Sequence, residues 1–192
     1  MRDDKPLRGH VFVAAGENGL RAFSFDGKTW THLRIERGGV LLQHACFFRG
    51  RCFAGGSFGG DLVAYHTQDA IAWQRNKLQS KPYAERLELL FATHNEVCGI
   101  ISTDGAPQAI RTKDGKSWSA RKALLDDWRV MVRDAHLRRV ARGNDRIVFT
   151  GDYGARLSGK SLDETFQAVP KASAKDTLID LAFGNGVFVG GG

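Results

Sequence analysis

The sequence lacks the features that mark a membrane protein or a common nucleotide-binding enzyme. No apolar stretch approaches the roughly 20 residues that a membrane-spanning helix needs. No nucleophile elbow, P-loop or dinucleotide fingerprint is present. The charged segment 1–10 has no apolar signal-peptide core, so nothing in this chain directs it out of the cytoplasm, and its compartment is left open.

Proline is scarce, with 4 residues against 23 glycines in a chain of 192. Glycine-rich sequence with β-branched and aromatic residues in many short apolar runs is typical of an all-β fold. The length is sufficient for one domain with an ample core.

Long runs of like charge are also absent, although the net charge is +7. The basic residues are spread along the chain, with one local concentration at Arg129, Arg133, Arg138, Arg139 and Arg142. We interpret the charge as a solvated surface and do not expect a nucleic-acid partner. A binding partner with negative charge is the alternative.

One short segment is repeated four times along the chain. The copies are Ser24 to Trp30, Thr67 to Trp73, Thr112 to Trp118 and the one-residue-shorter Ser161 to Phe166. Their aspartates, Asp26, Asp69, Asp114 and Asp163, are 43, 45 and 49 residues apart. A period of this size is typical of a β-propeller, in which one four-stranded blade takes roughly 40–50 residues.

The other repeated positions predict four strands in each unit, which we name a to d. Strand a carries a small residue (Cys46, Ala92, Ala141, Ala182), and strand b carries an apolar one (Phe12, Cys52, Cys98, Ile147, Phe188). A G-x-x-G or S-x-x-G segment follows strand b, where we expect glycine to supply the positive φ of a tight turn. Strand c runs into the Asp segment, and strand d carries the tryptophan. Such strands form a meander sheet.

The units define the expected blades of a single propeller domain spanning residues 1–192. The blades are expected at about residues 10–35, 41–75, 86–120, 136–169 and, in part, 178–192. The first unit lacks strand a, and the last contains only strands a and b. An unpaired strand edge is a hazard that natural folds avoid, so we expect the remaining blades in a longer chain. A closed ring of four blades is the alternative.

The three cysteines occupy core columns of this repeat. Cys52 and Cys98 replace Phe or Ile, and Cys46 replaces Ala. Free cysteine behaves as a small buried hydrophobe, and no C-x-x-C spacing is present. We therefore expect neither a metal site nor any cofactor.

The repeated aspartates have a structural interpretation. An aspartate in a turn accepts hydrogen bonds from backbone N–H groups that follow it, and a Ser or Thr two residues earlier adds another local bond. The aromatic residue is expected to fold back against the hairpin. A catalytic role is the alternative, but catalytic groups must converge on one bond, and four turns on separate blades do not.

The S-x-D-G-x-x-W segment at this period resembles the Asp-box, or bacterial neuraminidase repeat, of Asp-box β-propellers, and the resemblance extends from about His10 to Gly192. It implies a structural Asp-box turn away from the ligand face. The residues that match it are Ser24, Asp26, Gly27, Trp30, Thr67, Asp69, Trp73, Thr112, Asp114, Gly115, Trp118, Ser161, Asp163 and Phe166. The superfamily includes sialidases, other glycan-processing enzymes, sorting receptors and photosystem assembly factors, so the fold is indicated far better than the function, and an extracytoplasmic parent protein is compatible with it.

The sequence departs from the sialidases within this superfamily. Their R-I-P motif precedes an Asp-box, whereas Arg34-Ile35-Glu36 lacks the proline and follows one. None of the tyrosines lies in a motif that matches the sialidase nucleophile. We therefore predict a non-catalytic binding or scaffold module. The alternative is part of a glycoside-hydrolase or sialidase-like enzyme with catalytic residues outside this chain.

A ligand is expected on the face that the b–c turns share with the d–a connections. Aromatic and arginine side chains on loops are frequent anchors of recognition surfaces. The candidates are Tyr83, Trp128, Arg129 and Tyr153. We expect a protein or glycan partner there; coverage of a blade edge is the alternative role for Trp128.

Overall fold

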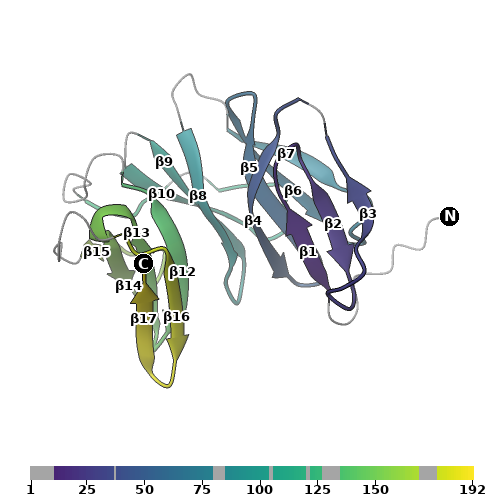
Figure 1. Ribbon diagram of the computed structural model, residues 1–192. Coiled ribbons are helices and arrows are strands. Elements are labelled where there is room, and N and C mark those ends of the chain that lie inside the picture. Colours follow the sequence, from purple (N-terminus) through teal and green to yellow (C-terminus); the bar gives the residue numbers. More distant parts are fainter. Residues whose placement is uncertain are drawn as a thin grey trace. The chain divides into compact units, whose positions relative to one another are not determined.

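The computed structural model describes residues 11–36, 38–79, 85–103, 106–119, 122–126, 135–168 and 177–192. These residues form antiparallel β-sheets joined by short turns, as the sequence predicts (Figure 1). Within them, no helix is long and apolar enough to cross a membrane.

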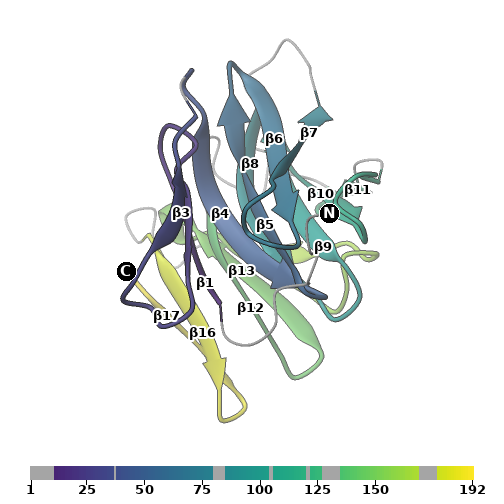
Figure 2. The ribbon, with the colours of Figure 1, turned by 90° about the vertical axis from the view of Figure 1, so that its right-hand side faces the viewer.

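The chain divides into two compact units, which we describe separately. The first comprises residues 1–98 and 111–119, and the second comprises residues 99–110 and 120–192. The first contains a three-stranded sheet, in the order β1 (Phe12–Ala15), β2 (Arg21–Ser24) and β3 (Thr31–Arg34). It also contains a four-stranded sheet of β4 (Leu41–Phe48), β5 (Arg51–Phe58), β6 (Asp61–Thr67) and β7 (Gln74–Gln79), which run side by side in blue in Figure 2.

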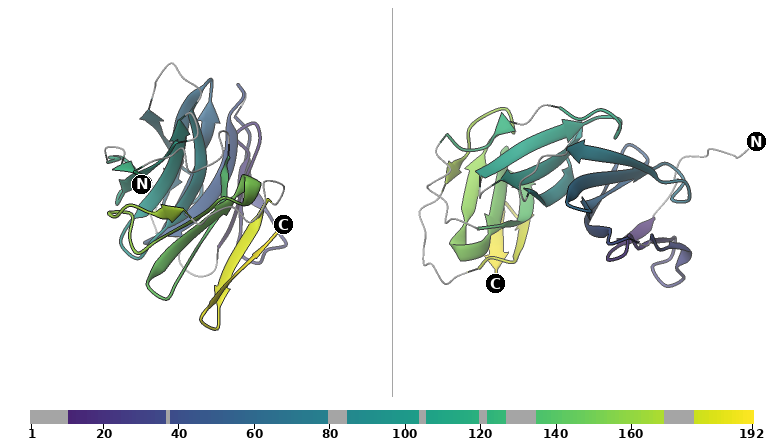
Figure 3. Two further views of the ribbon diagram at one scale, coloured as in Figure 1. Left: turned by 90° about the vertical axis from the view of Figure 1, so that its left-hand side faces the viewer. Right: turned by 90° about the horizontal axis from the view of Figure 1, so that it is seen from above.

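The third sheet has residues in both units. Its members are β8 (Glu85–Ala92), β9 (Val97–Thr103), β10 (Ala106–Thr112) and β11 (Lys122–Ala123). The second unit contains a sheet of β12 (Leu137–Gly143), β13 (Arg146–Gly151), β14 (Arg156–Gly159) and β15 (Gln167–Ala168), drawn in green in Figure 3. The hairpin of β16 (Asp180–Gly184) and β17 (Val187–Gly191), drawn in yellow, packs beside β12.

Within each unit the first strand of one sheet lies beside the first strand of the next. Strand β4 lies beside β8 in the first unit, and β12 lies beside β16 in the second. Backbone hydrogen bonds repeat in the same places: Leu42 N donates to Gly16 O at 3.1 Å, and Leu178 N donates to Gly151 O at 3.1 Å. The period of the sequence is therefore also a period of the structure.

The glycines of the G-x-x-G segments have two separate roles, and our expectation was correct for only one of them. The second glycine has the expected positive φ, 62° at Gly19 and 68° at Gly154. The first does not. A Cβ on Gly56 would lie 2.8 Å from the carbonyl carbon of Leu41, and one on Gly151 would lie 2.9 Å from that of His136. Glycine is needed there because the backbone of the neighbouring strand a occupies the space that a side chain would take.

The apolar column of strand b is buried in some sheets and open in one. Cys52, Cys98 and Ile147 are buried, but Phe12 is 50% exposed. The apolar character of this column predicts burial in every sheet. In the first sheet this prediction is wrong, because the side of β1 that carries Phe12 faces solvent.

Candidate functional site

The Asp turns form a repeated hydrogen-bond cage in the first unit. In the first turn, Asp26 Oδ1 accepts from the N–H groups of Lys28 and Thr29 at 2.8 and 2.7 Å, and from Ser24 Oγ at 2.8 Å. In the third, Asp114 Oδ1 accepts from Lys116 N at 2.8 Å, Ser117 N at 2.9 Å and Thr112 Oγ1 at 3.1 Å. Each carboxylate thus closes its own turn.

These contacts hold the carboxylates ionised. Hydrogen bonds from the backbone of Ser117 and Lys116 lower the pKa of Asp114 to about 2, and those from Thr29 and Lys28 hold the pKa of Asp26 well below its usual range. At Asp69 burial raises the pKa, but hydrogen bonds from Ala72 and Ile71 outweigh it, so the net shift is downward. A carboxylate fixed in this way is a poor general acid.

The fourth turn is one residue shorter. In it Asp163 N donates to Ser161 Oγ at 3.0 Å, and Glu164 N donates to the Ser161 carbonyl at 3.3 Å. Its aromatic residue, Phe166, is buried and packs against Phe149, with ring centroids 5.2 Å apart.

The tryptophans are buried to different degrees. Trp73 and Trp118 are half-buried, and Trp73 Nε1 donates to Ala70 O at 3.0 Å. Trp30 is 46% exposed, and it directly precedes β3 of the sheet that also contains the exposed Phe12.

The third turn also contacts the sheet of the preceding repeat. Arg51 Nη1 donates to Asp114 O, and Asn76 Nδ2 donates to Gly115 O, both at 2.6 Å. A Cβ on Gly115 would lie 2.8 Å from the rings of Phe53 and His66, so only glycine allows the turn to sit so closely.

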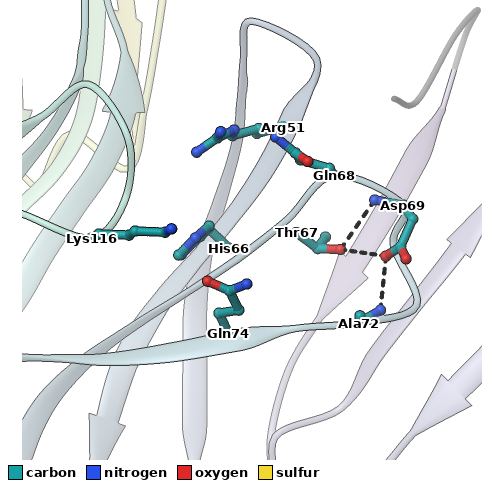
Figure 4. A pocket seen from close by; sticks show the side chains of 8 residues that line it. All are labelled: Arg51, His66, Thr67, Gln68, Asp69, Ala72, Gln74 and Lys116. Carbon is teal, nitrogen blue, oxygen red and sulfur yellow. Dashed lines mark hydrogen bonds between the residues drawn. The ribbon is translucent and has the colours of Figure 1, made fainter. Parts of the chain in front are cut away.

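A polar cavity of about 160 Å³ lies beside this contact. Figure 4 shows Lys116 reaching toward His66 and Gln74, with Arg51 and Gln68 above them. With its amide oriented to accept, Gln68 receives hydrogen bonds from Nη2 and Nε of Arg51 at 2.8 and 2.9 Å. Burial, together with the charges of Arg51 and Lys116, lowers the pKa of His66, so its ring is held neutral. Arg51 is bound to Asp114 and Gln68. The polar groups beside the cavity therefore mainly hold the third turn in place.

The described residues show no metal-binding chemistry. No three His, Cys, Asp or Glu side chains among them gather to hold a metal ion. The three cysteines carry free thiols. Burial raises the pKa of Cys46 to about 12 and that of Cys52 further still, so neither is a ready thiolate.

Only part of the predicted ligand face lies within the described residues. Tyr83, Trp128 and Arg129 lie outside them. Tyr153 lies in the short 3-10 turn η2 (Asp152–Gly154), is exposed and has φ 55°, a left-handed conformation that is rare for tyrosine. Arg138 braces this turn through Nε to Asp152 Oδ1 at 2.8 Å and Nη2 to Asp152 Oδ2 at 3.0 Å.

On the first unit, the same face is built by backbone bonds between a b–c turn and a d–a connection. Gly19 N donates to Val40 O at 2.8 Å, and Glu36 N donates to Asn18 O at 2.7 Å. The second of these bonds ties the backbone of Glu36 to the b–c turn.

Around Glu36 is a cluster that the sequence analysis missed. Arg21 Nη2 lies 2.9 Å and Tyr65 Oη 3.0 Å from Glu36 Oε2, while Arg75 Nη1 lies 3.5 Å from Oε1. The guanidinium of Arg21 lies 4.3 Å from the Tyr65 ring centroid, and that of Arg75 lies 4.9 Å from the Phe58 ring centroid. We call these five residues the Glu36 cluster.

The cluster has a buried half and an open half. Arg21 and Tyr65 are buried, whereas the Arg75 side chain is 47% exposed. Burial raises the pKa of Tyr65, and the neighbouring Glu36 carboxylate adds to this, so the hydroxyl remains a neutral donor. A tyrosine nucleophile needs the opposite: access to substrate and an activated hydroxyl. The buried half therefore fixes Glu36, and Arg75 with Phe58 forms the accessible half.

One signal in the sequence could have revealed this cluster. Arg21 occupies a column in which the other copies have Ala64, Ala109 and Ser158. A buried arginine in a small-residue column requires a partner, and Glu36 is that partner.

Comparison with known proteins places the fold. No protein-family profile and no curated protein matches this sequence. Among solved structures, YCF48 bound to a D1 peptide is similar at 19% identity with a TM-score of 0.66, over 96% of this chain and 60% of that one. The catalytic domain of the GH62 α-L-arabinofuranosidase of Coprinopsis cinerea is similar at 11% identity with a TM-score of 0.58, over 88% of this chain and 66% of that one.

These similarities confirm the predicted β-propeller fold, built of four-stranded antiparallel blades with incomplete ones among them. The chain spans 60% of the length of the YCF48 chain that it matches. At these identities the likeness concerns the fold alone.

Proposed function

We propose that this chain is the non-catalytic binding part of an Asp-box β-propeller protein, and that it takes an extended segment of a protein partner on its loop face. The observation that carries the proposal is the open half of the Glu36 cluster. There a half-exposed arginine lies over an aromatic ring and is oriented by a carboxylate that is itself fixed.

The chemistry of this surface suits a peptide. The Arg75 guanidinium has donors to spare beyond its contact with Glu36, and these match a backbone carbonyl or a carboxylate. The half-buried Phe58 offers apolar area beside it. Arginine and aromatic residues in such pairs are typical anchors of protein interfaces.

Two further facts support this proposal. The Asp turns hold their carboxylates by internal hydrogen bonds, which suits the structural role that the Asp-box resemblance implies. A structural neighbour was solved with a bound peptide. The alternative, a glycoside hydrolase, has its support in the fold of the arabinofuranosidase neighbour.

The test is peptide selection followed by variant binding. Peptides are selected from a displayed library on the wild-type chain, and their Kd is measured by fluorescence polarisation. We expect Arg75→Ala to weaken binding at least tenfold. Arg49→Ala is the matched control, because Arg49 lies over the Phe48 ring at 5.0 Å, the same kind of pair at the a–b turn of the same sheet.

Three results would refute the proposal. One is that no selected peptide binds, another is that Arg75→Ala and Arg49→Ala behave alike, and the third is that the chain hydrolyses aryl glycosides, α-L-arabinofuranosides included. The third result would establish the alternative.

A further inference from the structure

A polar cavity of about 160 Å³ in the first unit carries more positive charge than its structural role requires. Arg51 of β5, His66 of β6 and Lys116 of the third Asp turn line it, as Figure 4 shows. Asp69, in the second Asp turn, is the carboxylate of this lining. We call this space the Arg51 cavity. An apolar cavity of about 150 Å³ takes up benzene, so the Arg51 cavity is large enough for a small polyatomic ion.

The repeat shows that packing an Asp turn does not require these side chains. The equivalent residues of the first sheet and the second Asp turn are Val11, Phe23 and Ile71. All three are apolar, yet the second turn closes in the same way, with Ile71 N and Ala72 N donating to Asp69 Oδ1 at 2.8 Å. Like charges gathered at a partly buried position cost free energy unless an opposite charge joins them. A negatively charged ligand would offset that cost in the Arg51 cavity.

Both cations retain donors beyond those that hold the turn. A guanidinium has five N–H donors. In Arg51 one of them reaches the Asp114 carbonyl oxygen and two reach Gln68, which leaves two. The Lys116 side chain is exposed, and its ammonium forms no ion pair with the part of the chain that the structure describes. The cavity can therefore offer several N–H donors to one ligand.

The charges around the His66 ring are positive on balance. Burial lowers the pKa of His66, and the charges of Arg51 and Lys116 lower it further. The Asp114 carboxylate and the Gln74 side chain act in the opposite direction but do not outweigh them. An anion that enters the cavity is therefore attracted by its surroundings.

We propose that the Arg51 cavity is a binding site for a phosphate group, held by the Arg51 guanidinium and the Lys116 ammonium. A guanidinium matches phosphate oxygens in pairs, and an ammonium binds phosphate as a point charge. The exposed Gln68 and Gln74 also line the cavity, so a ligand can reach it from solvent. None of these residues belongs to the Glu36 cluster, so the site goes beyond the peptide binding proposed above. Free phosphate and the phosphoryl group of a larger molecule share this chemistry.

The first experiment titrates the wild-type chain with inorganic phosphate, followed by nuclear magnetic resonance at constant ionic strength with chloride as the balancing anion. We expect saturable shifts at the Lys116 backbone amide and at Arg51 Nε–H. Lys116→Met should raise the Kd about tenfold, because one charged contact is lost. Lys28→Met is the matched control, because Lys28 occupies the equivalent position of the first Asp turn and donates its backbone N–H to the turn aspartate in the same way.

Methyl phosphate distinguishes the two sources of the phosphate group. Binding as tight as that of inorganic phosphate assigns the site to the phosphoryl group of a larger molecule, and exclusion assigns it to free phosphate. Lys116 is changed rather than Arg51, because Arg51 also holds the third turn. Near-UV circular dichroism establishes that each variant is folded.

The pKa of His66 gives an independent measurement. Sulfate is the probe, because its charge is constant while histidine titrates. A bound anion should raise the pKa of His66, measured from its Cε1–H signal, and Lys116→Met should raise it without sulfate, since a cation is removed. The proposal is overturned if phosphate binding does not saturate, if Lys28→Met weakens it as much as Lys116→Met does, or if saturating sulfate leaves the pKa of His66 unchanged.

Discussion

Replacing Gly56 by alanine tests the physical reason for the glycine column. In β5, an added Cβ would lie 2.8 Å from the carbonyl carbon of Leu41 and 3.0 Å from the Leu42 Cα, atoms of the neighbouring backbone that cannot rotate aside. Overpacking of this kind costs about 1–3 kcal/mol. Moving β4 away also weakens the bond from Leu42 N to Gly16 O, worth about 1 kcal/mol. We therefore expect the free energy of unfolding to fall by about 3 kcal/mol.

A loss of that size is large against the total stability of a domain, about 5–15 kcal/mol. Urea unfolding followed by tryptophan fluorescence measures it, and the melting temperature should fall by roughly 6–12 °C. Gly184→Ala is the matched control, because no atom lies within 4 Å of its added Cβ, and it should change stability by less than about 0.5 kcal/mol. If Gly56→Ala costs no more than Gly184→Ala, close approach of strand a is not the reason for this glycine.

Three other outcomes follow from the ionisable groups. Because hydrogen bonds lower the pKa of Asp114 from 3.8 to about 2, its carboxylate stabilises the fold above pH 3.8 and loses that effect as the pH falls toward 2; Asp114→Asn should therefore flatten the stability profile in this window, measured by urea unfolding, and an unchanged profile would contradict the cage. Burial and Glu36 raise the pKa of Tyr65 above 10.0, so its contribution is present below pH 10 and is lost as pH rises through the folded value; Glu36→Gln should lower the Tyr65 pKa in an ultraviolet titration, and a higher value would contradict the assigned contact. Burial raises the pKa of the thiols of the half-buried Cys46 and the buried Cys52, so the folded chain should react with iodoacetamide at pH 8 far more slowly than the urea-unfolded chain; equal rates would contradict these raised pKa values.

The fold could be predicted because the same sequence pattern recurs in each blade. Strand c was expected to run into the Asp segment and strand d to carry the tryptophan; the structure has β2 at Arg21–Ser24, directly before the first Asp segment, and β3 at Thr31–Arg34, directly after Trp30. The turn glycines were half understood. Local sequence preference predicts the positive φ of the second glycine. The close approach of Leu41 to Gly56 depends on the neighbouring strand β4, which the local sequence around Gly56 does not predict.

The candidate site was less predictable, because it consists of departures from the repeat. Glu36 and Tyr65 are 29 residues apart and meet across two sheets, so no motif joins them. Comparing the aligned repeats could have identified Arg21 as exceptional. Its partner Glu36, however, lies in a connection between repeats that the alignment does not cover.

The most direct test of peptide binding on the loop face is nuclear magnetic resonance titration with a selected peptide. We predict that the largest shifts fall on the Arg75 side-chain Nε–H and on the backbone of Phe58 and Glu36, and that the backbone of the Asp26 and Asp114 turns is unchanged. Shifts concentrated in the Asp turns, with the Arg75 signal unmoved, would contradict this account.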